Sequence, residues 1–128
     1  LEKIEIFDDE LKRREKVARY YTQNIHKTFT SPLIPSKYFS SWAQYSILIP
    51  DKLDRNKVID SLRKEKIPSM VYYKIPAHLQ KAYEKYGYSR GEFQISEKIS
   101  NSILSLPMHP YLDKEDQYHI ISELNKYS

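Results

Sequence analysis

Histidine and tyrosine are the side chains that could give this 128-residue chain its chemistry. The four histidines are His26, His78, His109 and His119. None lies three or four residues from another, so no helix turn would present two imidazoles to one metal ion. Asp116 and His119 are three residues apart, but on a terminal helix this pair is more simply part of a solvated face. We therefore predict no metal site.

The composition excludes several other classes of site. Cysteine is absent, which removes disulfides, cysteine-ligated zinc and a cysteine nucleophile. Two glycines are too few for a glycine-rich phosphate loop, and no serine lies in the glycine-flanked turn of a hydrolase. The net charge of +4 is a mild excess, and lysines alternating with glutamates favour solvated helix faces over a nucleic-acid track. No apolar run is long enough for a membrane span, and no signal peptide is visible.

Tyrosine is unusually frequent, with 12 residues against 4 Phe and 1 Trp. Tyrosine is favoured on half-wet surfaces such as interfaces and pockets. The densest cluster is VYYKIPAHLQKAYEKYGY, residues 71–88, where a strand end runs into a Pro-His turn. Consecutive strand residues point to opposite sides, so either Tyr72 or Tyr73 must point away from the core. Because loops after strands often carry binding residues, we take this segment as the candidate site.

The rest of the chain must position that loop. Apolar residues three and four apart predict one long helix over about 1–26, and Tyr45, Ile47 and Ile49 alternate as one face of a strand. A helix capped by Asp51 or Asp54 is predicted next, followed by a strand over 70–73 and a helix over 77–85 that ends at Gly87. A helix over 94–102 then leads into an edge strand over 103–106. The last predicted helix follows Asp113, with Tyr118, Ile121 and Leu124 on its packed face. The expected fold is α+β: a small antiparallel or mixed sheet of about three strands packed with helices, in one domain spanning residues 1–128.

A set of short motifs occurs in an order that resembles one known family. The motifs are Arg14, Ala18 and Tyr21 on the first helix, Trp42-Ala43-Gln44-Tyr45, Arg55, Ile67-Pro68, YYKIPAHLQ at 72–80 and LSLPMHP at 104–110. Together they resemble the C-terminal small domain of the DegT/DnrJ/EryC1/StrS sugar aminotransferases, which are fold-type I enzymes that use pyridoxal phosphate. The chain departs from the family pattern at Tyr72 and Lys74, which stand at a His and a Pro, at Asn56, which replaces an acid, and at Lys66, where glycine is usual. Tyr73, Pro76 and His78 keep the pattern.

The resemblance implies an activity that needs more than this chain. Family members transfer an amino group from glutamate to a keto nucleotide-sugar, through a lysine and a pyridoxal phosphate bound in a large N-terminal domain. It therefore implies no catalytic, cofactor-binding or metal residue here, and an inactive fragment when the chain is alone. It further implies a cytoplasmic homodimer that makes precursors of polysaccharides or other amino sugars, without nucleic acid or membrane as partner. Tyr72, Tyr73 and His78 are the implied substrate-binding residues.

Alternatives remain open from the residues. His78 could instead cap the following helix or bond a backbone carbonyl. The chain could belong to a dehydratase that uses the same cofactor, be a free-standing module for anionic ligands or nucleic acid, or be a non-catalytic remnant. Because the chain begins at Leu1 rather than Met, we expect it to be a piece of a longer protein. Such a piece should expose an apolar patch on its first helix or on the sheet, and could self-associate.

Overall fold

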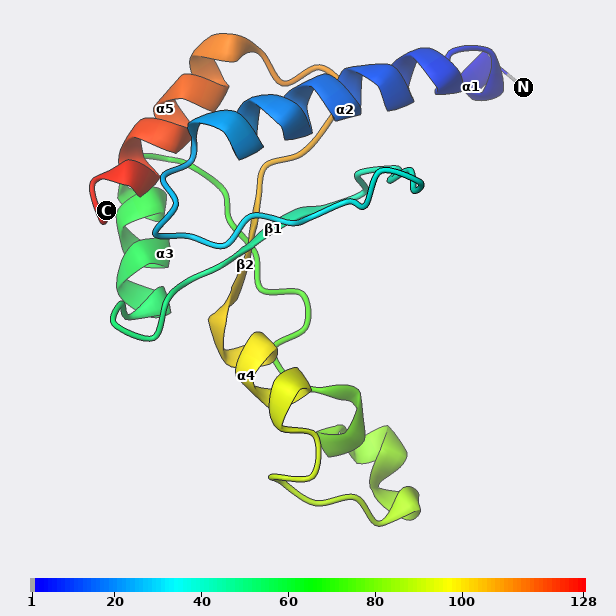
Figure 1. Ribbon diagram of the computed structural model, residues 1–128, viewed down its shortest axis with the longest axis vertical. Coiled ribbons are helices and arrows are strands. Elements are labelled where there is room, and N and C mark those ends of the chain that lie inside the picture. The colour runs from blue at the N-terminus through cyan, green and yellow to red at the C-terminus, as the bar shows by residue number, and fades with distance from the viewer. Residues whose placement is uncertain (1) are drawn as a thin grey trace.

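The computed structural model describes residues 2–128, with side chains described from residue 4 onward, and it has the α+β class expected. Its elements are α1 (Glu2–Glu5), α2 (Phe7–Asn24), β1 (Tyr45–Leu48), α3 (Arg55–Lys64), the 3-10 helices η1 (Ala77–Leu79) and η2 (Lys81–Tyr86), α4 (Gln94–Ser102), β2 (Ile103–Leu106) and α5 (Lys114–Asn125). In Figure 1, α2 and α5 lie along one side of the strand pair, and the segment that contains η1, η2 and α4 extends from the other side.

The sheet is an antiparallel pair of strands, β1 with β2, in which Tyr45 is opposite Leu106. The predicted strand over 70–73 is reduced to one bridging residue, Met70, which pairs antiparallel with Ser105 of β2. Residues 103–106 form the predicted strand β2, which is an edge of the two-stranded sheet except at Ser105, where Met70 pairs on its other side. Pro107 follows the strand and so removes no hydrogen bond from the ladder.

The core forms where the predicted face of β1 meets α2. Tyr45 and Ile47 are fully buried, and the rings of Tyr45 and Tyr21 are 4.9 Å apart. The hydroxyl of Tyr21 donates to the carbonyl of Pro107 at 3.0 Å, which satisfies the one polar group on this ring. Burial raises the pKa of both phenols, because a phenolate would be poorly solvated there.

The apolar stripe of the first helical segment is buried only in its second half. A turn at Ile6 separates α1 from α2, so the single predicted helix is interrupted. Ala18 and Tyr21 lie in the core, whereas Ile4 and Phe7 on the same apolar stripe are exposed. The exposed patch expected on the first helix is therefore present.

Helices α3 and α5 begin at the aspartates that the sequence allows as caps. Asp54 accepts a hydrogen bond from the backbone N–H of Asn56, and Asp113 accepts one from Asp116, both at 2.8 Å. The predicted packed face of α5 is partly wrong, because Tyr118 is exposed. The buried face of α5 consists of Gln117, Ile120, Ile121, Glu123 and Leu124.

The turn after α3 has a backbone conformation that favours glycine, the residue that is usual in the family pattern where this chain has Lys66. Lys66 has φ +61°, in the left-handed region that glycine adopts without steric cost. The N–H of Ile67 donates to the carbonyl of Leu62 across this turn at 2.9 Å. Glycine is therefore the residue that fits the backbone at this position, and Lys66 occupies it at some cost.

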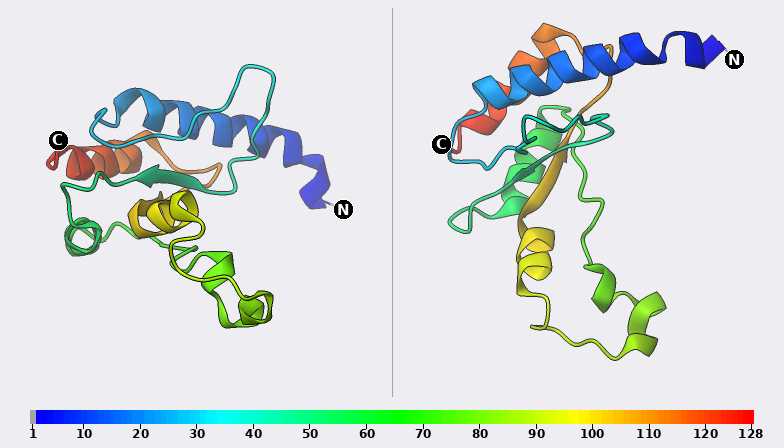
Figure 2. Two further views of the ribbon diagram at one scale, coloured as in Figure 1. Left: turned by 60° about the horizontal axis from the view of Figure 1, so that its bottom comes forward. Right: turned by 45° about the vertical axis from the view of Figure 1, so that its right-hand side comes forward.

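We call residues 74–102 the excursion, because they leave the body of the domain and return to it at β2. The views of Figure 2 agree with Figure 1 that this segment projects away from α2 and α5. The helix predicted over 77–85 consists of the two 3-10 helices, and Gly87 ends η2 with φ +75° as expected. Residues 80–96 are exposed throughout, so the excursion has little core of its own.

Candidate functional site

His78 is the most enclosed polar side chain of the predicted site. Its side chain is 8% exposed, and its Nε2 lies 3.1 Å from Oε1 of Glu97. Pro76, before η1, provides no side-chain cap, and the partner of His78 is a carboxylate on α4. The alternative in which His78 caps a helix or bonds a backbone carbonyl is therefore wrong. η1 supplies the imidazole and α4 supplies the carboxylate, from positions 19 residues apart.

Glu97 also binds the turn that contains Gly91, through the same oxygen that contacts His78. Its Oε1 also accepts the backbone N–H of Gly91 at 2.7 Å. Gly91 has φ +96°, which a residue with a Cβ adopts only with strain. The hydrogen bond from Gly91 is the main cause of a lowered pKa for the Glu97 carboxyl, and His78 lowers it further. Glu97 is therefore ionised at neutral pH.

Aromatic rings surround this polar contact. The rings of His78 and Phe93 are 4.7 Å apart, and Tyr88 meets Phe93 edge-on at 5.1 Å. Tyr83 and Tyr86 stack at 6.2 Å on η2. We call the resulting open hollow of about 440 Å³ the aromatic hollow; it is lined by Ala77, His78, Tyr83, Tyr86, Tyr88, Phe93 and Ser96. Most of the tyrosine cluster found in the sequence thus faces one concave surface.

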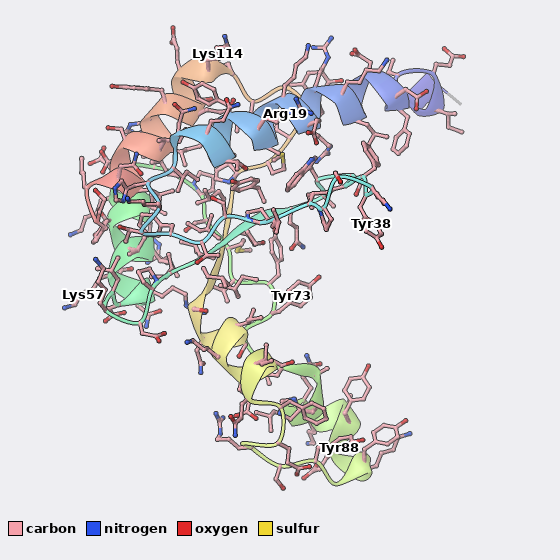
Figure 3. All side chains as sticks on the ribbon, viewed as in Figure 1. Arg19, Tyr38, Lys57, Tyr73, Tyr88 and Lys114 are labelled. Carbon is pink, nitrogen blue, oxygen red and sulfur yellow. The ribbon has the colours of Figure 1, made fainter. Side chains whose placement is uncertain are left out.

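The structure does not bring the three predicted residues into one pocket of this chain. Tyr72 is 56% exposed and lines a separate hollow of about 140 Å³ beside Met70 and Met108, at the end of the sheet. Tyr73 is 61% exposed, and Figure 3 shows its ring pointing outward from the segment that leads into the excursion. The three side chains thus lie along the entry to the excursion and present separate surfaces.

Arg55 anchors the other end of the excursion. From the start of α3, its Nη1 donates to the carbonyl of Ser100 at 2.7 Å and to that of Ile103 at 3.2 Å. These carbonyls lie where α4 passes into β2, so one guanidinium fixes the return of the chain to the sheet. The resemblance pointed to Arg55 without a role. Glu97 had no signal in the sequence, because its partners are set by the folding of a loop.

The described lysines and glycines lack two features that are common in pyridoxal phosphate sites. A lysine that forms a Schiff base is commonly desolvated, whereas every lysine whose side chain the structure describes is exposed. Neither glycine provides a crowded phosphate cradle, since a Cβ at either would meet no atom within 4 Å. Among the described residues, no three histidine, aspartate or glutamate side chains are grouped to hold a metal ion. The described helices also include none long and apolar enough to cross a membrane.

Comparison with known proteins gives one consistent family. The model of the DegT/DnrJ/EryC1/StrS aminotransferase family matches residues 1–125. The chain is 28% identical over 126 residues to a dTDP-3-amino-3,6-dideoxy-alpha-D-galactopyranose transaminase of Aneurinibacillus thermoaerophilus, covering 98% of this chain and 33% of that protein. It is 33% identical over 114 residues to a UDP-2-acetamido-2-deoxy-3-oxo-D-glucuronate aminotransferase of Pseudomonas aeruginosa, covering 88% of this chain and 30% of that protein.

Solved structures agree with this match. A DegT DnrJ EryC1 StrS aminotransferase from Brucella abortus superimposes with a TM-score of 0.89 and 40% identity, over 99% of this chain and 33% of that one. The PLP-form of a putative sugar aminotransferase from Streptococcus pneumoniae shares the fold, with a TM-score of 0.82 at 21% identity, over 98% of this chain and 34% of that one. The chain therefore spans about a third of the length of the relatives that it matches.

Proposed function

This chain belongs to the DegT/DnrJ/EryC1/StrS aminotransferase family, and we propose that it is the C-terminal small domain of a complete sugar aminotransferase. The observation that carries the proposal is a family match over residues 1–125 that accounts for only a third of each relative. The motif order supports the C-terminal placement, because LSLPMHP at 104–110 resembles the segment that closes the family's sequences. Residues 1–128 then form one domain, and the large domain precedes it.

The exposed apolar face of the first helix fits this proposal. Ile4 and Phe7 on the α1–α2 segment, and Leu33 and Phe39 on the following loop, are all more than half exposed. An open hollow of about 410 Å³ lies between α2 and Phe39. Several large apolar side chains exposed on one helix and the loop after it are typical of a surface that another domain covers. We assign this face to contact with the large domain.

In the complete enzyme, the reaction would move an amino group from glutamate to a keto group on a nucleotide-linked sugar. Pyridoxal phosphate, when bound to a lysine of the large domain, supplies the electron sink for this chemistry. Two relatives are named for dTDP-linked and UDP-linked sugars, so we propose a pyrimidine nucleotide-sugar as the substrate. The enzyme would be a cytoplasmic homodimer, and the present chain alone would be inactive.

This chain's part in the reaction would be to bind and orient the sugar nucleotide. Tyr72 and Tyr73 are exposed at the entry to the excursion, and His78 stands in the wall of the aromatic hollow. Tyrosine rings offer an apolar face and a hydroxyl, which suits the mixed surface of a sugar. A partly enclosed imidazole held by a carboxylate can donate or accept a proton at a fixed atom. We propose that these three residues border the nucleotide-sugar site.

The test is a kinetic comparison in the complete enzyme. Amination by glutamate would be measured on a panel of UDP-linked and dTDP-linked keto sugars, and the best substrate would then be used for the variants. We expect Tyr73→Ala and His78→Ala to raise the KM for the sugar nucleotide and to lower kcat/KM. Tyr118→Ala is the matched control, because Tyr118 is exposed on α5, outside the excursion. Unchanged KM and kcat in both site variants would refute the assignment of the site, and the absence of amination on the whole panel would refute the activity.

A further inference from the structure

Glu97 does more than neutralise a histidine, because one of its oxygens ties together two points far apart in the excursion. Oε1 receives the imidazole of His78 from η1 and the N–H of Gly91 from the turn before α4. Together with α4, these bonds close residues 78–97 into a ring. The aromatic side chains of that ring, including Tyr88 and Phe93, are the ones that line the aromatic hollow.

The ring needs such a link because it has little apolar core. Residues 80–96 are exposed, and a segment with few buried contacts opens at low free-energy cost. The side chain of Glu97 is only 13% exposed, in contrast to its surroundings. A charge-assisted hydrogen bond shielded in this way is stronger than an exposed one, since water competes less for the oxygen. Glu97 is thus placed to decide whether the hollow keeps its shape.

The contact also selects one form of the histidine ring. With an ionised carboxylate as its partner, Nε2 carries a proton and donates it. In the neutral imidazole, Nδ1 is then an acceptor, and among the described residues it has no hydrogen-bond partner. This leaves a defined acceptor on a ring in the wall of the aromatic hollow, suited to a hydroxyl donor such as that of a sugar.

We propose that Glu97 is a positioning residue of the nucleotide-sugar site. It holds His78 in the Nε2–H form and holds the 88–93 turn in place. Nδ1 of His78 then accepts a hydrogen bond from a hydroxyl of the substrate. This inference rests on the proposed function for the identity of the ligand. Glu97 itself does not touch the substrate. Its contribution is the fixed orientation of the imidazole and of the rings beside it, which lowers the entropy lost on binding.

The first test uses the 128-residue chain and needs no substrate. The chain has two glycines, so the amide signals of Gly87 and Gly91 can be followed in a nitrogen–proton correlation spectrum. We expect the Gly91 signal to titrate with a midpoint below 4.5, the ordinary pKa of glutamate, because the Glu97 carboxyl has a lowered pKa. Glu97→Gln and Glu97→Ala should abolish this titration, and Gly87 should be unaffected by them. If the Gly91 signal titrated in both variants as it does in the wild-type chain, the contact between Gly91 and Glu97 would be refuted.

The second test separates position from charge in the complete enzyme. Glu97→Ala should raise the KM for the best sugar nucleotide by about tenfold, the equivalent of one well-made hydrogen bond, with a smaller effect on kcat. Glu97→Gln keeps an acceptor oxygen for both donors, so it should restore KM to within about threefold of wild type. Glu84→Ala is the control, because Glu84 is an exposed glutamate on η2. A Gln variant as impaired as the Ala variant would overturn positioning in favour of charge.

The outcomes distinguish this inference from the proposed function. If His78→Ala raises KM and Glu97→Ala does not, the site stands and the role of Glu97 is refuted. If His78→Ala leaves KM unchanged, the proposed site fails first, and the titration of Gly91 then only establishes the contact within the fold. The inference is supported when both alanine variants raise KM and the double variant raises KM by less than the product of the two single effects, because the two residues then act partly through one contact.

Discussion

Arg55 allows a quantitative test of how the excursion is attached to the domain. Its guanidinium donates from Nη1 to the carbonyls of Ser100 and Ile103. Hydrogen bonds to a charged group are worth about 1.5–3 kcal/mol each, so the two contribute roughly 4 kcal/mol in total. The Nε of Arg55 is buried without a partner, which costs about 1–3 kcal/mol. The net contribution to the free energy of unfolding is therefore about 2 kcal/mol.

The perturbation that isolates this contribution is Arg55→Met, which keeps most of the apolar stem and removes the donors. We expect the free energy of unfolding in urea to fall by about 2 kcal/mol, which lowers the midpoint by roughly 1 M for a domain of this size. Hydrogen exchange should also show α4 losing protection more than α5, because the lost bonds hold the end of α4. Arg55→Lys should give a partial loss, since the shorter lysine side chain must place its ammonium where Nη1 of Arg55 reaches both carbonyls.

The matched control is Arg63→Met on the same helix. Arg63 pairs with Asp60 at 2.9 Å, and both side chains are more than half exposed. Exposed pairs of this kind contribute about 0.5 kcal/mol or less. If Arg55→Met destabilised the chain no more than Arg63→Met, the two carbonyl contacts would not be what holds the excursion to the sheet.

Three further predictions follow from single features. Because burial raises the pKa values of Tyr21 and Tyr45, the unfolded chain releases these two protons before the folded chain does, so the free energy of unfolding falls as pH rises above 10, the ordinary pKa of tyrosine. Ultraviolet titration should show these two phenols ionising after the exposed tyrosines, and one common transition for all would contradict this. Lys66→Gly should stabilise the chain by about 1 kcal/mol in urea unfolding, since it relieves a left-handed backbone; a loss of stability would contradict the strain. Phe7→Asp should reduce concentration-dependent association in sedimentation, because it puts a charge on the exposed apolar face, and unchanged association would place the contact elsewhere.

Features that depend on neighbours in the chain could be predicted from the sequence. Asp54 and Asp113 begin helices because an aspartate oxygen reaches the N–H two or three residues ahead. Helix α4 has the predicted bounds, Gln94–Ser102, and the alternation through Tyr45 and Ile47 places one face of β1 in the core. The family could be identified as well, because its motifs are short runs in a conserved order along the chain, and the match over residues 1–125 confirms it.

Features that depend on distant partners were decided by the tertiary structure. Tyr118 has the spacing of a packed residue, but α5 turns Gln117 inward instead, where its amide donates to the carbonyl of Val17 on α2. Local spacing carries no information about which flank of a helix its neighbour will cover.

In the candidate site, too, the sequence indicated the residue types and the tertiary structure decided their partners. The sequence indicated Tyr72, Tyr73 and His78 as one group, but the fold separates Tyr72 from His78 and gives the histidine a partner, Glu97, 19 residues away. That pairing exists because Gly91 turns the chain back and because Arg55 holds the end of α4 against the sheet. Residue types and local spacing determined which groups were available for chemistry. Long-range contacts decided which of them meet, because bringing distant residues together costs loop-closure entropy that only the contacts of the folded chain offset.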